Sequence, residues 1–395
     1  MDSIQVGGFR FAGLSCGIKK SGKADLGLIV ANAPVACAGV FTTNQVVAAP
    51  VVQSQARLHE RNMARAIIVN SGNANACTGA QGEADARRMA ALVAGVVGCV
   101  PRDVQVCSTG VIGAPLPMDK IESGLTPLMD ALRTDGLEDF ADAICTTDTH
   151  RKVRSAHAKI GDRTVRVAGA SKGAGMIHPN MATMLGFVVT DAPIDPEDLK
   201  QIWKEVCARS FNAITVDGDT STNDTALVMA SGAAGGGPLK GADLASFQAL
   251  LLEVASELAK DIVRDAEGAT KLVEVVVSGA SCVQDAILAS NAIALSPLVK
   301  TAIHGEDPNW GRIVAAAGRS GAKVNPTAMC LWIGDVMLYE NGAWLGSSAE
   351  ADAHQIMKRP EFSLRLDLGT GSVKRTVFTC DFSADYVRIN ADYRS

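Results

Sequence analysis

The chain has 395 residues, with 37 Lys and Arg against 42 Asp and Glu, a formal net charge of −5. This balance disfavours nucleic-acid binding, because displacing counterions from nucleic acid needs a concentration of basic side chains. A hydrophobic content of 47% with only 20% charged residues excludes a disordered chain and is typical of two or three globular domains, or of one large intertwined domain.

The sequence also disfavours secretion and membrane insertion. The N-terminus lacks the charged and apolar regions of a signal peptide, and the longest apolar run, Met89–Val100, contains two glycines and is shorter than a membrane span. The ten cysteines are scattered singly, with no C-x-x-C pair and no Cys/His cluster. We expect a cytoplasmic protein with free thiols and no metal site.

Hydrophobic periodicity predicts helices between groups of short strands. In chain order, we expect a strand at Ala66–Asn70, a helix at Ala84–Val97, strands at Val104–Cys107, Thr164–Ala168 and Met184–Thr190, helices at Pro196–Cys207 and Phe247–Ile262, and strands at Leu272–Val277, Met329–Ile333 and Val373–Phe382. Ile160-Gly-Asp162 and Asn341-Gly342 predict hairpins, and Gly232–Gly237 predicts a surface loop. These features favour a layered α+β fold over a doubly wound sheet.

Three sequence patterns that could indicate a functional site are not supported by their neighbouring residues or spacing. Gly169–Gly173 matches G-x-S-x-G, but the glycines and the proline that follow break the helix that a nucleophile elbow requires. The segment from Asp217 has Thr222 and Val228 where a calcium loop needs glycine and glutamate. The six histidines show no metal-ligand spacing.

The segment from Lys172 to Asp191 has an unusual sequence. A glycine-rich stretch, a proline that restrains His178 and a small Ala182 lead directly to Thr183 at the start of an apolar strand. A threonine at the end of a strand can be a nucleophile, although an isolated threonine is far more often an ordinary strand residue.

The wider pattern resembles the ornithine acetyltransferase (glutamate N-acetyltransferase) family of arginine biosynthesis over essentially the whole chain. The resemblance rests on eight blocks in order, Gly39–Asn44, Val69–Gly79, Ser108–Gly113, Thr146–Thr149, Lys172–Asp191, Val216–Asp224, Glu267–Lys271 and Asp307–Arg312. Pro-Asn-Met-Ala-Thr-Met-Leu within the fifth block is the most specific. We interpret the last block as a structural turn.

The resemblance implies a precursor that cleaves itself between Ala182 and Thr183, giving chains 1–182 and 183–395 that assemble as α2β2. It also implies a layered α/β/β/α sandwich of largely antiparallel sheets. The Thr183 hydroxyl would attack the Ala182 carbonyl, and hydrolysis of the resulting ester would free the threonine amine, which has a suitable pKa for a base at neutral pH.

The mature enzyme would move an acetyl group from N2-acetylornithine to glutamate through acetyl-Thr183, without a cofactor. By the same resemblance, Thr109 and Gly110 would form the oxyanion hole. Lys172 would face the substrate carboxylate and Glu267 the ornithine ammonium, while the pocket would also be lined by Thr146, Asn390 and Ser395. Taken singly, Lys172 could be a solvated loop residue and Glu267 could end a helix. Asn390 and Ser395 could be frayed tail residues.

Three alternative functions remain open. A bifunctional enzyme would also accept acetyl from acetyl-CoA, a self-processing aminopeptidase of related fold would pass the acyl group to water, and a binding protein would remain uncut. The sequence does not distinguish the first from the monofunctional enzyme. The Pro-Asn-Met-Ala-Thr-Met signature disfavours the second, and the third predicts a single uncleaved chain.

Overall fold

A computed structural model describes residues 5–178 and 184–392. The chain divides into two compact units. The larger contains the described residues up to Asn212 together with Asp219–Ile262, and the smaller contains Ala213–Gly218 and residues 263–392. Each unit has its own sheet, and the two sheets share no strand.

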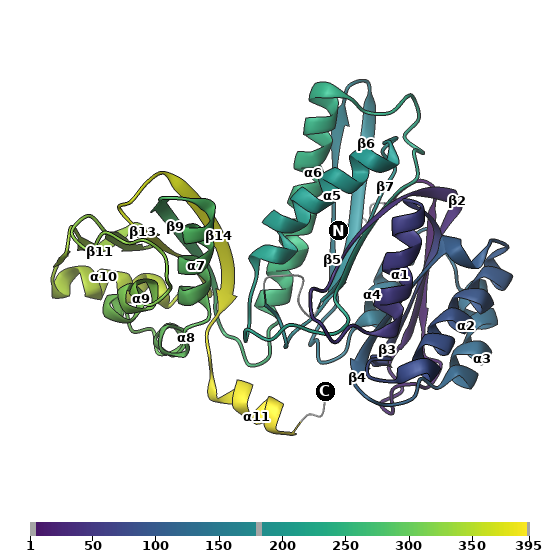
Figure 1. Ribbon diagram of the computed structural model, residues 1–395, viewed down its shortest axis with the longest axis horizontal. Helices are drawn as coiled ribbons and strands as arrows, with labels where there is room; N and C mark the ends of the chain where they lie inside the picture. The colour runs from purple at the N-terminus through teal and green to yellow at the C-terminus, as the bar shows by residue number, and fades with distance from the viewer. Residues whose placement is uncertain (1–4, 179–183, 393–395) are drawn as a thin grey trace. The chain divides into compact units, whose positions relative to one another are not determined.

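The larger unit is built on a mixed sheet in the order β4-β3-β2-β8-β7-β6-β5, with β1 also pairing with β2 (Figure 1). The β3–β4 and β7–β8 pairs are parallel and the other pairs are antiparallel. Its described strands are β1 (Phe9–Leu14), β2 (Leu26–Phe41), β3 (Met63–Asn73), β4 (Val104–Val111), β5 (Lys152–Ile160), β6 (Arg163–Lys172), β7 (Leu185–Thr190) and β8 (Thr225–Ala230).

Helices pack on this sheet because its strands present apolar side chains on both faces. Successive residues point to opposite sides, so Ile68 joins a core with α2 and α3, while Ile67 joins a second core with Phe140 of α4. The described helices of this unit are α1 (Ala49–Glu60), α2 (Gly79–Val97), α3 (Met118–Asp130), α4 (Leu137–Ile144), α5 (Pro196–Arg209) and α6 (Gly241–Arg264).

The smaller unit has a sheet in the order β12-β11-β10-β13-β9-β14, in which only the β9–β13 pair is parallel among the described strands. Its strands are β9 (Leu272–Ala280), β10 (Cys330–Ile333), β11 (Val336–Glu340), β12 (Ala343–Trp344), β13 (Glu361–Asp367) and β14 (Val373–Cys380). Its helices are α7 (Val283–Ala294), α8 (Pro297–His304), α9 (Trp310–Gly318), α10 (Ser347–Met357) and α11 (Ala384–Asp392).

These two helix-covered sheets confirm the α+β class. The three predicted helices correspond to α2, α5 and α6, and the predicted turn at Ile160 joins the antiparallel strands β5 and β6. Asn341-Gly342 likewise joins β11 and β12. Both chains expected from self-cleavage contribute to the larger sheet, because β6 precedes Thr183, β7 follows it, and the two strands pair.

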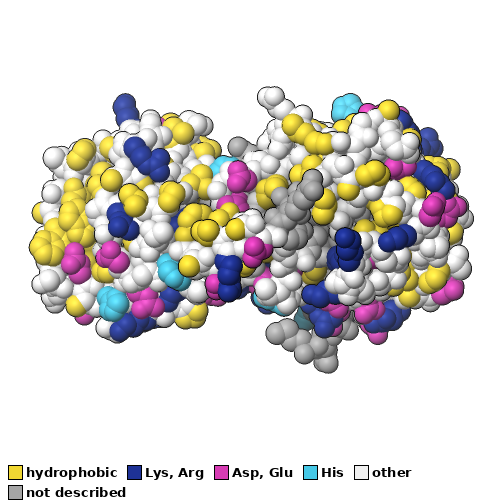
Figure 2. Space-filling model, turned by 90° about the horizontal axis from the view of Figure 1, so that it is seen from below, with side chains coloured by type: hydrophobic (Ala, Val, Ile, Leu, Met, Phe, Trp, Pro, Cys, Tyr) yellow, Lys and Arg dark blue, Asp and Glu magenta, His cyan; other side chains and the backbone are white. Residues whose placement is uncertain are grey.

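Positive and negative side chains are interspersed on the molecular face shown in Figure 2, which agrees with the nearly balanced charge of the sequence. Among the described helices, none is by itself both long and apolar enough to cross a membrane; the bent pair of α7 and α8 meets that standard only when the two helices are taken together.

Candidate active site

The ends of β3 and β4 form one wall of the candidate site. The strands run in parallel, so Thr109 and Gly110 lie beside Ser71 and Gly72. Gly110 has φ +133°, and a Cβ added there would lie 2.4 Å from the Gly72 carbonyl carbon. Only glycine therefore fits this close approach of two backbones, which places the Thr109 side chain and the Gly110 amide at the same strand ends.

Lys172, the last residue of β6, reaches this wall. Its Nζ donates a hydrogen bond to Thr109 Oγ1 at 3.1 Å, and the lysine is only 4% exposed. Burial lowers the pKa of Lys172, while the negative charge of Asp148 opposes that shift. Because the Thr109 oxygen accepts this bond, its own proton remains available for another acceptor.

The Asp148 carboxylate joins the segment at Thr146 to the end of β6 by hydrogen bonds. Its carboxylate accepts hydrogen bonds from Lys152 Nζ at 2.6 Å and from the backbone amides of Gly173 and Thr146, both at 2.8 Å. Burial alone would raise the pKa of Asp148, but the charges of Lys152 and Lys172 outweigh it and hold that pKa well below its ordinary value. Asp148 is therefore a buried anion that fixes the backbone on both sides of the site.

Three of the sequence blocks meet at Asn223, which is buried. Its Nδ2 donates to the carbonyl oxygens of Ala74 at 2.6 Å and Ser108 at 2.9 Å. The Ser108 hydroxyl in turn donates to Asn70 Oδ1 at 2.6 Å. This network holds the residue that precedes Thr109 against the loop after β3. Three blocks that are separate in the sequence are therefore joined by hydrogen bonds.

The next residue, Asp224, holds the start of β7. Its Oδ1 accepts a hydrogen bond from the Met184 amide at 2.8 Å, and the aspartate is 0% exposed. Ala182 and Thr183, the residues of the expected cleavage site, lie outside the described residues. The structure thus describes the strand that follows Thr183 but not the proposed nucleophile itself.

The rejected Ser171 nucleophile is in the middle of this region but is unsuited to catalysis. It lies within β6, is fully buried, and donates its hydroxyl proton to the Leu258 carbonyl oxygen at 3.2 Å. A nucleophile elbow needs an exposed serine at a turn between a strand and a helix. The structure therefore agrees with the rejection of that motif.

Glu267 and Asn390 come together in the smaller unit. Asn390 Nδ2 donates to Glu267 Oε2 at 2.9 Å and to the Tyr386 carbonyl oxygen at 3.0 Å. The adjacent Gly268 has φ +69°, and a Cβ there would lie 2.5 Å from the Tyr386 nitrogen. Because α6 ends at Arg264, Glu267 belongs to the following turn and not to the helix end. Ser395, the remaining expected pocket residue, lies outside the described residues.

Asp381 anchors the loop that follows Glu267. Its carboxylate accepts hydrogen bonds from the Thr270 and Lys271 amides at 2.7 and 2.9 Å, and lies 2.7 Å from His304 Nδ1. Burial opposes ionisation, but these hydrogen bonds outweigh it and lower the pKa of Asp381. Asp381 therefore fixes the end of this loop that leads into β9.

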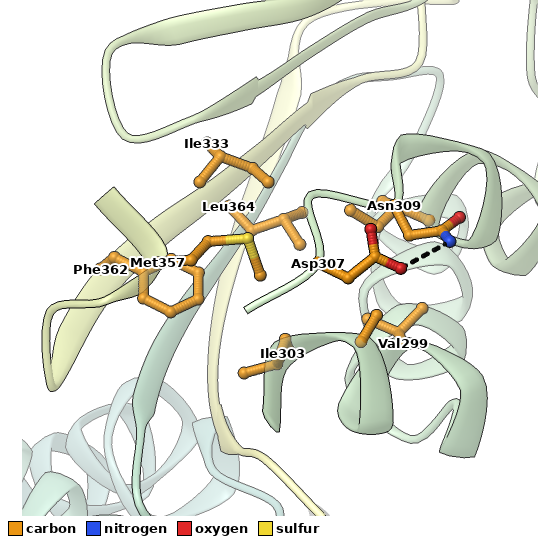
Figure 3. Close-up of a pocket in the computed structure, with 10 residues that line it drawn as sticks. Val299, Ile303, Asp307, Asn309, Ile333, Met357, Phe362 and Leu364 are labelled. Atoms are coloured by element: carbon orange, nitrogen blue, oxygen red, sulfur yellow. Dashed lines mark hydrogen bonds between the residues drawn. The ribbon is translucent and has the colours of Figure 1, made fainter. Parts of the chain in front are cut away.

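The Asp307–Arg312 block forms the entry to α9, where the Asn309 side chain caps the helix by accepting from the Arg312 amide. Figure 3 shows Asp307 and Asn309 at one side of a small pocket whose other walls are apolar. Its volume of about 10 Å³ is enough for a single water molecule and too small for an amino acid. Asn309, Gly311 and Arg312 also line a second, larger pocket of about 360 Å³, so the structural interpretation of the block stays a prediction.

Sequence reasoning missed four polar residues that organise these regions, namely Asp148, Asn223, Asp224 and Asp381. The first three lie inside blocks that carry the family resemblance, which was the available signal. Nothing in the local sequence marked Asp381, because its role depends on hydrogen bonds to a loop more than a hundred residues earlier.

The chain is similar along nearly its whole length to proteins of one family. The ArgJ family model matches residues 10–395. The arginine biosynthesis bifunctional protein ArgJ of Geobacter sulfurreducens is 50% identical over 394 residues, which cover 99% of this chain and 100% of that protein. The protein of the same name from Symbiobacterium thermophilum is 47% identical, with coverage of 98% and 97%.

A crystal structure of the Bacillus halodurans arginine biosynthesis bifunctional protein ArgJ is also similar. It is 43% identical, with a TM-score of 0.52, and the match covers 53% of this chain and 100% of that one. The match of the family model to nearly every residue, together with relatives of close to half identity over their full length, shows that the chain belongs to the ArgJ family, the acyltransferase family that the sequence resemblance predicted.

Proposed function

We propose that this chain cleaves itself between Ala182 and Thr183 and then transfers an acetyl group from N2-acetylornithine to glutamate through acetyl-Thr183. The observation that carries the proposal is the hydrogen bond from Lys172 Nζ to Thr109 Oγ1 beside Gly110. It orients the Thr109 hydroxyl, next to the Gly110 amide in the chain, in the unit that contains the strand after Thr183.

The direction of that hydrogen bond supports the proposed oxyanion hole. Attack on the acetyl carbonyl produces a tetrahedral intermediate with a negatively charged oxygen. Because the Thr109 oxygen accepts from Lys172, the Thr109 proton can point to the oxyanion, and the Gly110 amide supplies a second donor. A nearby lysine cation strengthens both donors in a buried site, where charges are weakly screened.

The transfer itself requires two successive acyl exchanges at Thr183. In the first, the hydroxyl attacks the acetyl amide of N2-acetylornithine and ornithine leaves; in the second, the glutamate amine attacks the acetyl ester. The free amine of Thr183 serves as the base in both steps. The acetyl group begins and ends as an amide, so the proposal needs neither ATP nor a cofactor.

The proposed donor substrate carries a carboxylate and an ammonium, and the family resemblance assigns a residue to each. Lys172 has three donors and uses one for Thr109, so it can donate to the substrate carboxylate as well. Thr146, whose amide donates to Asp148, lines the pocket by family resemblance. Glu267 would pair with the ornithine ammonium, and its orientation is set by Asn390. Ser395 completes the set by family resemblance alone.

The proposal includes a second acetyl donor. The relatives from Geobacter and Symbiobacterium are named bifunctional proteins, which favours acetyl-CoA as an alternative substrate of the same threonine. Chains 1–182 and 183–395, an α2β2 assembly and a cytoplasmic location also belong to the proposal, and they come from the sequence resemblance and composition.

Thr183→Ala tests the proposal directly, because one hydroxyl serves both cleavage and transfer. The variant should remain a single chain and lose acetyl transfer, while Thr183→Ser, which keeps a hydroxyl, should retain some cleavage. Denaturing electrophoresis and an ornithine-release assay measure the two outcomes. Acetyl transfer by the alanine variant at the wild-type rate would refute the assignment of Thr183.

A further inference from the structure

Asp224 is a buried carboxyl group that binds the residue following the proposed nucleophile, and the transfer reaction gives it no role. It is 0% exposed, and its Oδ1 accepts the Met184 amide hydrogen at 2.8 Å. The Met184 nitrogen belongs to the peptide bond with Thr183, which is about 1.33 Å long. The carboxyl group therefore holds the amide of the residue that directly follows Thr183 in the chain.

The second oxygen of Asp224, Oδ2, is the one that could take up a proton. Among the described residues, Oδ2 has no hydrogen-bond partner although it is fully buried. The Thr42 hydroxyl and the Ser221 amide lie close enough to the carboxyl group to lower its pKa, but the Thr42 hydroxyl donates its proton to the Ser221 carbonyl oxygen at 2.7 Å. A buried acceptor left without a donor is unfavourable, and such groups in native structures commonly have a chemical role.

Self-cleavage needs a proton acceptor that the transfer reaction does not need. In the mature enzyme the free amine of Thr183 is available as a base. In the precursor the same nitrogen is part of the Ala182–Thr183 amide, which is not basic. Another group must therefore remove the hydroxyl proton before the chain has been cut.

We propose, on the basis of the function proposed above, that Asp224 Oδ2 accepts the proton of the Thr183 hydroxyl when the chain cleaves itself. As the proton moves to Oδ2, a bond forms between Thr183 Oγ and the Ala182 carbonyl carbon. The proton then passes to the Thr183 nitrogen as the C–N bond breaks, which leaves Ala182 as an ester on Oγ. Water hydrolyses that ester to the Ala182 carboxylate and the Thr183 hydroxyl, and Asp224 is regenerated.

The electrostatic setting of Asp224 suits this role. Burial raises its pKa well above the ordinary value, while the Met184 amide and the charge of Lys172 act in the opposite direction. A raised pKa gives the carboxylate a greater affinity for protons near neutral pH, as a general base requires. Lys172 is a weaker candidate, because its Nζ donates to Thr109 and lies in the field of Asp148.

Asp224→Asn separates proton acceptance from simple positioning. Asparagine keeps an oxygen for the Met184 amide but cannot take up a proton at neutral pH. We expect the full-length variant, made by cell-free synthesis and followed on denaturing gels, to cleave at least about 100-fold more slowly than wild type. The exposed Asp219 lies in the same sequence block, so Asp219→Asn is the matched control and should cleave at the wild-type rate.

A wild-type cleavage rate in Asp224→Asn would overturn the proposal. Circular dichroism shows whether the variant folds; if it does not, the pH dependence of wild-type cleavage decides. The cleavage rate should fall as the pH is lowered and Asp224 becomes protonated. A cleavage rate that does not change between neutral and acidic pH would refute the proton-acceptor role. Failure of wild type itself to cleave would instead refute the proposed function on which this inference rests.

Discussion

Replacing Asp148 with asparagine should strongly destabilise the larger unit. The Asp148 and Lys152 side chains are both 0% exposed, and their charged atoms lie 2.6 Å apart. The variant leaves Lys152 and Lys172 without a compensating negative charge, and breaking a buried ion pair costs about 3–5 kcal/mol. Because asparagine retains one acceptor, we expect about 3 kcal/mol, or a fall of about 6–12 °C in the melting temperature.

Thermal unfolding measured at two pH values tests whether loss of the Asp148 charge causes the destabilisation. The pKa of Asp148 is lowered by folding, so its stabilising contribution is present above the ordinary aspartate pKa of about 3.9 and declines as the pH falls below it. The difference between wild type and Asp148→Asn should therefore be smaller at about pH 3 than at pH 7.

Asp142→Asn is a suitable control, because Asp142 forms an exposed ion pair with Arg151. Exposed pairs contribute about 1 kcal/mol or less, so this variant should melt close to wild type. Wild-type stability of Asp148→Asn at pH 7, or a difference that grows as the pH falls, would refute the ion-pair reasoning.

Three further substitutions test candidate residues in each of the two units. Thr109→Ala should lower kcat for acetyl transfer by about 10²–10³-fold in the processed enzyme, with Thr109→Ser retaining most activity; an unchanged kcat would make Thr109 an ordinary turn residue. Gly110→Ala should reduce the yield of folded, cleaved protein, because the new Cβ would lie 2.4 Å from the Gly72 carbonyl carbon, whereas Gly95→Ala meets nothing within 4 Å and should fold normally. If bound substrate desolvates the pair, Glu267→Gln should lower kcat/KM for N2-acetylornithine by the equivalent of about 2–5 kcal/mol and leave cleavage intact; kinetics equal to wild type would exclude an ammonium contact.

Local sequence predicted elements well where one physical signal dominated. The helix α5 begins with Pro196, Glu197 and Asp198, and its apolar residues follow helical spacing, so its start and buried face were predictable. The long strand β2 was missed, because Asn32 and Pro34 interrupt its apolar run. The structure accommodates them in an irregular stretch between Val30 and Val35, which only the neighbouring strands reveal.

The candidate site was predictable as a set of residues but not as a set of contacts. The family blocks pointed to Thr109 and Lys172, whose side chains meet although they are 63 residues apart in the sequence. Their meeting depends on strand pairing across the larger sheet, which periodicity does not specify. The same holds for Asp148 and Asp224, because their roles arise from amides and charges that other elements supply.

The mass of the purified protein, measured before and after mixing with N2-acetylornithine without glutamate, tests the central claim most directly. The account predicts two chains, the second beginning Thr-Met-Leu-Gly, and one added acetyl group on the second chain that glutamate removes. A single, fully active chain of 41.0 kDa would contradict it, as would an acetyl group attached anywhere other than Thr183.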